Sequence, residues 1–307
     1  MRCATLLPMS PEAIAETDVL DVRAPDGRTL HTQAAGPADG DLVIVHHGTP
    51  SSSLLAAWWA EDAAARGIRL VGYDRPGYGR SDSQPGRRIG DAAADTAAIA
   101  DAYGADRFRT WGISGGGPHA LACAALLPDR IIAAAALASV APYGASGLDY
   151  LAGMGEDNVV EFELAIQGEG ALRPRHAEQH QEMRQSTPDG LWEMLRTLLP
   201  DADLGVLTGE MATFMHQWMM RGFEAGYEGW LEDDLAFVSD WGFRVEDIKV
   251  PTLVVQGRLD LMVPFAHGEW LAAAIPGATA RLSDTDGHLT LLRDLGPVHE
   301  WLLATPS

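Results

Sequence analysis

The sequence predicts an α/β fold: a mostly parallel, doubly wound sheet with helices on both faces and a helical cap inserted into it. Three observations lead to this prediction. Five continuous apolar runs end at glycine or polar residues, as strands buried on both faces of a parallel sheet do. Helix-like segments alternate with these runs. The alternation then stops between about Tyr143 and Trp241, where the chain becomes rich in helix-forming residues, methionine and tryptophan.

The elements follow in order along the chain. A hairpin is expected first, with Asp26-Gly27 as its turn and "TLHTQAAG" as the returning strand. The apolar runs predict strands at residues 41–48, 68–74, 107–114, 131–139 and 251–257, and "ATARLS" predicts a short strand near the end. Helices are expected at residues 53–66, 89–103, 115–127, 265–274 and 291–303. In such a sheet, function lies at the carboxyl ends of the strands.

The length of 307 residues fits one large domain with an insertion. We assign residues 1–142 and 242–307 to the core domain and residues 143–241 to the cap. Within the cap, residues 209–230 contain four methionines and several aromatic residues. Methionine adapts to irregular space, so this stretch either roofs an apolar substrate pocket or forms ordinary cap core. Trp192 and Trp218 are candidate pocket walls.

Composition excludes several classes of protein. The 43 acidic residues outnumber the 22 basic ones and give a formal net charge of −21, which repels nucleic acid and anionic lipid. No apolar run is long enough to cross a bilayer, and the N-terminal apolar segment is too short for a secretory signal. Cys3 and Cys123 form neither a disulfide framework nor a metal-ligand spacing. We therefore expect a cytoplasmic protein that acts on a small molecule and needs no cofactor or metal. The sequence gives no signal for an oligomeric state.

The stretch "TWGISGGGPH" (residues 110–119) surrounds one serine with glycines between a predicted strand and a predicted helix. A sharp strand-to-helix turn exposes a side chain above the sheet only if the residues two before and two after it lack bulk, and Gly112 and Gly116 occupy these positions. The helix start leaves N–H groups unpaired, so the amide of Gly115 could stabilise an oxyanion. A nucleotide-binding loop is the competing interpretation, but neither Gly-Lys-Ser/Thr nor the G-x-G-x-x-G spacing is present. Ser114 is therefore the candidate nucleophile.

A serine nucleophile needs a histidine base and a carboxylate that orients the base. His288 is the best candidate base because it lies in a loop just before the final helix. Asp260 is the preferred acid, since it follows the end of the strand at residues 251–257. Asp284 and Asp286 are rivals by proximity to His288 in sequence, and Asp149 is the alternative by position along the chain.

The order Ser114, Asp260, His288 matches that of α/β-hydrolases, and the chain resembles this superfamily in further motifs. "HHGTP" resembles the oxyanion loop, "YDRPGYGRSD" the Asp-x-Pro-Gly-x-Gly-x-Ser loop and "GISGGGP" the elbow, while "QGRLDLMVP" and "DGHL" resemble the acid and histidine segments. The resemblance implies the α/β-hydrolase fold, with an oxyanion hole formed by the backbone N–H groups of Thr49 and Gly115. It also implies that His47 shapes its loop rather than acting as a base.

Departures from the family pattern narrow the prediction. Dehalogenases and epoxide hydrolases of this superfamily carry aspartate at the elbow, and proline iminopeptidases typically show Gly-Gly-Ser-Trp-Gly there, whereas this chain has Gly-Ile-Ser-Gly-Gly. We therefore expect a serine hydrolase of small to medium, fairly apolar carboxylic esters or lactones.

Two alternatives remain open. An aminopeptidase similar to proline iminopeptidases is supported by the acidic residues Glu156, Asp157, Glu161 and Glu163, which could recognise a substrate amine or simply form a solvated helix face. A non-catalytic protein that binds a ligand with the same fold is the other alternative.

Overall fold

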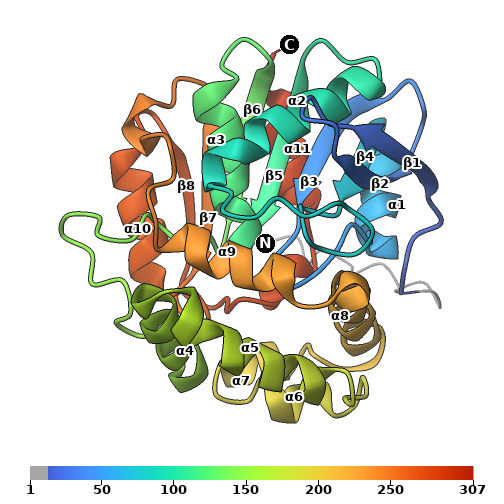
Figure 1. Cartoon of the computed structure of the whole chain (residues 1–307). Helices are drawn as coiled ribbons and strands as arrows, with labels where there is room; N and C mark the ends of the chain where they lie inside the picture. Colours follow the sequence, from blue (N-terminus) through green and yellow to red (C-terminus); the bar gives the residue numbers. More distant parts are fainter. Residues whose placement is uncertain (1–12, 307) are drawn as a thin grey trace.

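The computed structural model describes residues 13–306, apart from the side chain of Trp192, so Cys3 and the Trp192 side chain lie outside the described part. Eight strands form one sheet in the order β1-β2-β4-β3-β5-β6-β7-β8 (Figure 1). Their bounds are β1 Asp18–Arg23, β2 Thr29–Ala35, β3 Asp41–His46, β4 Ile68–Tyr73, β5 Phe108–Ile113, β6 Ile131–Leu137, β7 Thr252–Gly257 and β8 Thr279–Ser283. The first two strands form the predicted hairpin, β2 pairs antiparallel with β4, and the remaining pairs are parallel. The predicted mostly parallel, doubly wound α/β-hydrolase sheet is confirmed.

The central strands are apolar because they are buried on both faces: every residue of β5, β6 and β7 is buried. One face packs against α1 (Ala57–Ala65) and α11 (Gly296–Ala304), through Trp59 and Leu302. The other face packs against α2 (Ala92–Ala102), α3 (Gly117–Leu126) and α10 (Phe265–Ala274), through Ile99 and Leu121. Burial of large apolar side chains on both faces, at about 25 cal/mol per Å², is the main stabilising term of this core.

The segment 143–241, which we call the cap, lies between β6 and β7. Its helices are α4 (Glu156–Gln167), α5 (Glu169–Met183), α6 (Leu191–Met194), α7 (Asp201–Leu204), α8 (Gly209–Gly222) and α9 (Glu228–Phe237). In Figure 1, α4 to α8 form a layer beneath the sheet, and α9 lies between this layer and the core. The cap therefore faces the edge of the sheet where the strands β3 and β5 end.

Two predicted helices begin later than expected, and the first of them, predicted at residues 53–66, begins at Ala57. The final helix begins at Gly296 rather than at Leu291, because residues 290–292 form a separate 3-10 turn and Pro297 takes a first-turn position. The methionine-rich stretch 209–230 divides into α8 and α9, because Gly226, with φ of 107°, adopts a conformation that favours glycine. Within residues 13–306, no helix is both long and apolar enough to cross a membrane.

Candidate active site

Ser114 lies on a sharp turn directly after β5. Its φ of 55° is unusual for a residue other than glycine and marks local strain of the kind found at functional sites. A β-carbon at Gly112 would overlap the carbonyl group of Gly116, and one at Gly116 would overlap the carbonyl group of His46. The two glycines flanking Ser114 are thus required by close backbone contacts, as the sequence predicts.

Asp260 and His288 form a buried hydrogen-bonded pair. Asp260 Oδ2 lies 2.8 Å from His288 Nδ1, and Asp260 Oδ1 accepts the N–H groups of Met262 and Val263 at 2.9 and 2.8 Å. These bonds fix the carboxylate, which in turn fixes the imidazole ring and leaves Nε2 available for proton transfer. Ser114 lines the same pocket as His288, although no hydrogen bond joins the two among the described residues.

Sequence reasoning missed a second carboxylate at this histidine. Asp203 of α7 is fully buried; its Oδ2 accepts the N–H of His288 at 2.6 Å, and its Oδ1 accepts those of Leu289 and Thr290 at 2.8 and 2.9 Å. Burial lowers the pKa of His288, but the charge and hydrogen bond of Asp260 and the charge of Asp203 outweigh this effect and raise the pKa above its ordinary value. Asp203, which belongs to the cap, therefore fixes the backbone of the loop that carries His288.

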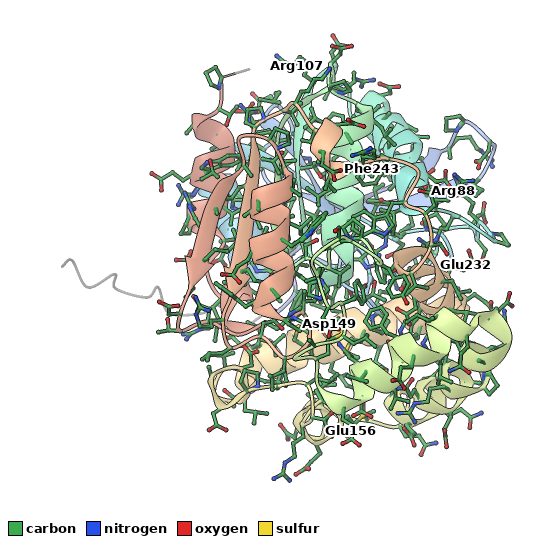
Figure 2. All side chains as sticks on the ribbon, turned by 90° about the vertical axis from the view of Figure 1, so that its left-hand side faces the viewer. Arg88, Arg107, Asp149, Glu156, Glu232 and Phe243 are labelled. Carbon is green, nitrogen blue, oxygen red and sulfur yellow. The ribbon has the colours of Figure 1, made fainter. Side chains whose placement is uncertain are left out.

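The rival acids lie elsewhere. Asp284 forms an exposed ion pair with Arg258. Asp149, labelled in Figure 2, is exposed on the loop that precedes α4. Of the acids considered from the sequence, Asp260 is the one that contacts His288 in the structure.

Thr49 lines the pocket beside Ser114 and Gly115, on the loop that follows β3. A β-carbon at Gly115 would overlap the Thr49 side chain, so the two backbone segments predicted to form the oxyanion hole lie together. His47 contacts the carbonyl oxygen of Gly48 through Nδ1 at 2.7 Å and accepts the N–H of Arg75 through Nε2 at 3.2 Å. Burial and the charge of Arg75 lower the pKa of His47, and both contacts fit the predicted loop-shaping role.

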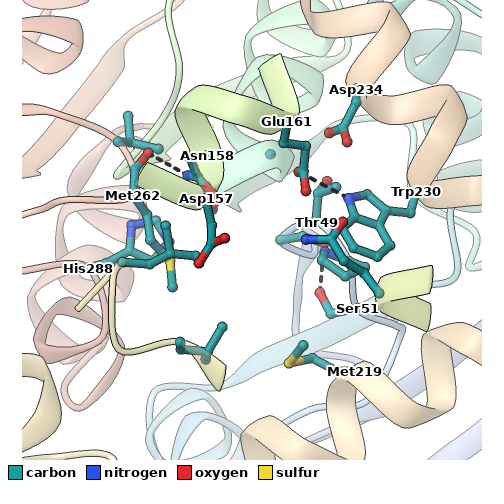
Figure 3. A pocket seen from close by; sticks show the side chains of 18 of the residues that line it. Thr49, Ser51, Asp157, Asn158, Glu161, Met219, Trp230, Asp234, Met262 and His288 are labelled. Carbon is teal, nitrogen blue, oxygen red and sulfur yellow. Dashed lines mark hydrogen bonds between the residues drawn. The ribbon is translucent and has the colours of Figure 1, made fainter. Parts of the chain in front are cut away.

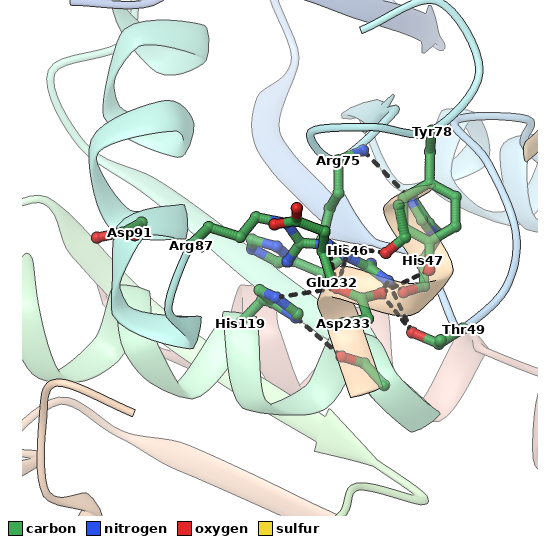
Figure 4. Close-up of polar contacts among 12 residues, drawn as sticks. His46, His47, Thr49, Arg75, Tyr78, Arg87, Asp91, His119, Glu232 and Asp233 are labelled. Atoms are coloured by element: carbon green, nitrogen blue, oxygen red, sulfur yellow. Dashed lines mark hydrogen bonds and ion pairs between the residues drawn. The ribbon is translucent and has the colours of Figure 1, made fainter. Parts of the chain in front are cut away.

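A buried carboxylate of the cap anchors this loop, and sequence reasoning missed it as well. Asp233 of α9 accepts hydrogen bonds from Thr49 Oγ1 at 2.6 Å and Tyr78 OH at 2.8 Å, and it pairs with Arg75 and Arg87 at 2.5 and 2.6 Å (Figure 4). Burial raises the pKa of this carboxyl, but the charges of the two guanidinium groups outweigh it and hold the pKa well below the usual range. Asp233 thus connects the cap to the loop carrying Thr49.

The pocket between core and cap has a volume of about 250 Å³. Most of its wall is apolar, and part of this wall comes from the methionine-rich stretch through Met215, Trp218, Met219 and Trp230. Both interpretations of the stretch therefore find support: these four residues, Trp218 among them, line the pocket, and they also belong to the buried core together with Met211 and Phe214.

The polar part of the pocket wall is acidic. Among the described residues, Asp157, Glu161, Glu182 and Asp234 line it together with one guanidinium group, that of Arg175. Figure 3 shows Asp157, Glu161 and Asp234. Of the predicted acidic segment, Asp157 and Glu161 reach the pocket, whereas Glu156 and Glu163 are exposed to solvent. Burial and the charge of Asp234 raise the pKa of Glu161 to about 8.

Comparison with known proteins agrees with the fold. A family model described as alpha/beta hydrolase fold matches residues 41–162. The chain is 32% identical to Epoxide hydrolase B of Mycobacterium tuberculosis over 48% of its own length and 42% of that protein. It is 27% identical to a 2-hydroxy-6-oxononadienedioate/2-hydroxy-6-oxononatrienedioate hydrolase of Paraburkholderia phymatum over 84% of each chain. Its structure resembles that of an enol-lactonase from Burkholderia xenovorans, with a TM-score of 0.67, 20% identity and coverage of 93% and 99% of the two chains.

The sheet order, the match of residues 41–162 to the family model and these similarities show that the chain has the α/β-hydrolase fold. The fold and the names of the relatives support a hydrolase.

Proposed function

We propose that the protein is a serine hydrolase that cleaves small to medium, fairly apolar carboxylic esters or lactones. The proposal rests mainly on one observation: the Asp260–His288 pair, joined at 2.8 Å, opens onto the same pocket as Ser114 on its strained turn. This arrangement supplies a nucleophile, a base and an orienting acid, the three groups that acyl transfer to serine requires.

In the proposed reaction, the Ser114 hydroxyl attacks the substrate carbonyl carbon while His288 accepts the hydroxyl proton. The N–H groups of Thr49 and Gly115 stabilise the oxyanion of the tetrahedral intermediate. His288 then donates the proton to the leaving alkoxide, which departs as an alcohol and leaves an acyl group on Ser114. In the second half, His288 accepts a proton from water, whose hydroxide attacks the acyl group, and Ser114 is regenerated as the acid leaves.

The pocket wall supports the substrate class. Its apolar lining favours an apolar acyl or alcohol part, and its excess of carboxylates disfavours dianionic substrates such as a dioate. Because the fold resembles that of an enol-lactonase, lactones should be assayed beside esters. Transfer of epoxide hydrolysis from the Mycobacterium tuberculosis relative is disfavoured, because that class carries aspartate where this chain has Ser114.

A substrate panel tests the proposal. We expect p-nitrophenyl esters of short and medium acids, or enol-lactones, to be turned over, and Ser114→Ala to abolish this turnover while circular dichroism stays unchanged. If Ser114→Ala turned these substrates over as fast as the wild-type protein, Ser114 would not be the nucleophile. A folded wild-type protein that binds such esters without cleaving them would favour the non-catalytic alternative.

Aminopeptidase activity is the second candidate. It is supported by the carboxylates that line the pocket, Asp157, Glu161 and Asp234, because a substrate ammonium group would pair with them. Prolyl naphthylamide, added to the same panel, separates the two candidates: faster cleavage of the amide than of the esters would favour the aminopeptidase.

A further inference from the structure

Three polar side chains from three cap helices meet at one wall of the pocket; His176 and Asp234 are buried and Glu161 is half-buried. Glu161 comes from α4, His176 from α5 and Asp234 from α9. His176 Nε2 lies 2.9 Å from Asp234 Oδ2 and 3.9 Å from Glu161 Oε2. One nitrogen or oxygen atom from each residue lies within 4.8 Å of the other two. Figure 3 shows Glu161 and Asp234 beside Trp230, facing the same part of the pocket.

Two of these groups, His176 and Asp234, have buried polar atoms without a hydrogen-bond partner among the described residues. The exposed fraction is 0% for His176 and 2% for Asp234. Three of their atoms have no hydrogen-bond partner of acceptable geometry within the described part of the chain: both ring nitrogens of His176, and Oδ2 of Asp234. Nε2 and Oδ2 are therefore close without a hydrogen bond between them. Buried polar atoms without a partner are rare in proteins, so we expect a ligand that binds both His176 Nε2 and Asp234 Oδ2.

Trp230 holds two of the three groups in place. Its indole Nε1 donates to Glu161 Oε1 at 3.3 Å, and Glu161 Oε2 is the oxygen nearer to His176. Its ring stacks on the His176 imidazole, with ring centroids 4.0 Å apart. Supporting contacts of this kind fix the orientation of ligating side chains in metal sites.

We propose that Glu161, His176 and Asp234 bind a divalent transition-metal ion such as Zn²⁺. Tetrahedral bonds of about 2.0–2.1 Å place neighbouring ligand atoms roughly 3.3 Å apart, between the two separations measured from His176 Nε2. A substrate ammonium needs acceptors at about 2.9 Å and hence roughly 4.7 Å from one another, which is wider than either separation. Two carboxylates and one neutral imidazole also balance the charge of a divalent ion.

The ion would tie α4, α5 and α9 together and so stabilise the packing of these cap helices beside the pocket. It takes no part in the acyl transfer proposed for Ser114, so the two proposals stand or fall separately. Because Glu161 and Asp234 line the pocket, the fourth coordination position would be open to water or to a substrate oxygen.

Zinc binding to the full chain tests the proposal directly. The protein, without a histidine tag and freed of metal by a chelator, is dialysed against micromolar ZnCl₂, and bound zinc is measured by mass spectrometry. We expect one Zn²⁺ per chain and a higher melting temperature with zinc than without it. His176→Ala and Glu161→Gln should each weaken binding by at least about 100-fold, since they remove a direct ligand.

Matched controls exist on the same helices. His180→Ala on α5 and Glu163→Gln on α4 should retain zinc binding. In the wild-type chain, Co²⁺ should give visible absorption bands that added Zn²⁺ removes, which tests the site without any substitution. Three results would overturn the proposal: absence of stoichiometric zinc in the wild type, zinc binding unchanged in both ligand variants, or prolyl amide turnover lost in Glu161→Gln while zinc does not bind.

Discussion

Asp203→Asn tests whether the cap holds His288, the proposed catalytic base, in place. The Asp203 carboxylate accepts three backbone N–H groups at 2.6–2.9 Å, one on Oδ2 and two on Oδ1. Asparagine retains one oxygen and replaces the other with an NH₂ group, so at least one buried donor loses its acceptor. An unsatisfied buried donor costs about 1–3 kcal/mol, and the free energy of unfolding should fall by this amount. The melting temperature should fall by several degrees, at about 2–4 °C per kcal/mol.

Activity should fall as well, because the lost bond loosens the loop that carries His288. Displacement of a catalytic group by about 1 Å costs on the order of 100-fold, so we expect kcat for a p-nitrophenyl ester to fall about 10- to 100-fold while KM changes little. Asp201→Asn is the matched control, since Asp201 is an exposed aspartate on the same helix.

The pH profile separates this role from simple destabilisation. His288 must be neutral to accept a proton, so the raised pKa of His288 places the acidic limb of kcat/KM above the ordinary value of about 6.5. Removal of the Asp203 charge lowers the pKa of His288, and the limb should move to lower pH. An Asp203→Asn variant whose rate and pH profile match those of Asp201→Asn would refute the reasoning.

Two further predictions concern the other buried acids. Asp260→Asn should lower kcat by about 10³- to 10⁴-fold, because the amide no longer orients Nδ1 of His288, and should move the acidic limb to lower pH; an ester assay across pH 5–9 checks both, and a near-normal rate would transfer the role to another carboxylate. Asp233→Asn should lower the free energy of unfolding by about 3–5 kcal/mol, because the guanidinium groups of Arg75 and Arg87 are left buried without their counter-charge. Urea unfolding measures this change, and Asp240→Asn, at the exposed partner of Arg88, is the control that should leave stability unchanged.

Much of the sheet could be predicted because its strands are apolar on both faces. The run at residues 131–139 is alanine-rich, yet it forms the fully buried β6, since small side chains allow α3 to pack closely on it. Ser114 was identifiable because the flanking glycines are required by local backbone contacts that the sequence itself displays. The candidate triad members each follow the end of a strand, and parallel topology brings such residues to one edge of the sheet.

The cap carboxylates could not be predicted in the same way. Asp203 contacts residues 85 to 87 positions away, and Asp233 contacts Thr49 from 184 positions away. No local spacing pattern marks either aspartate, because each role is set by how the cap packs on the core. The same holds for His176 and Asp234, which meet only when α5 and α9 are packed together.

The most direct measurement of the central proposal is the mass of the protein during turnover of a p-nitrophenyl ester. After rapid acid quench and proteolysis, we expect one acyl group per chain, located on Ser114, and we expect it to persist longer in His288→Ala if any acylation occurs there. An acyl group on another residue, or turnover without any acylated Ser114 under conditions in which p-nitrophenol is released in a burst, would contradict the proposed acyl-enzyme.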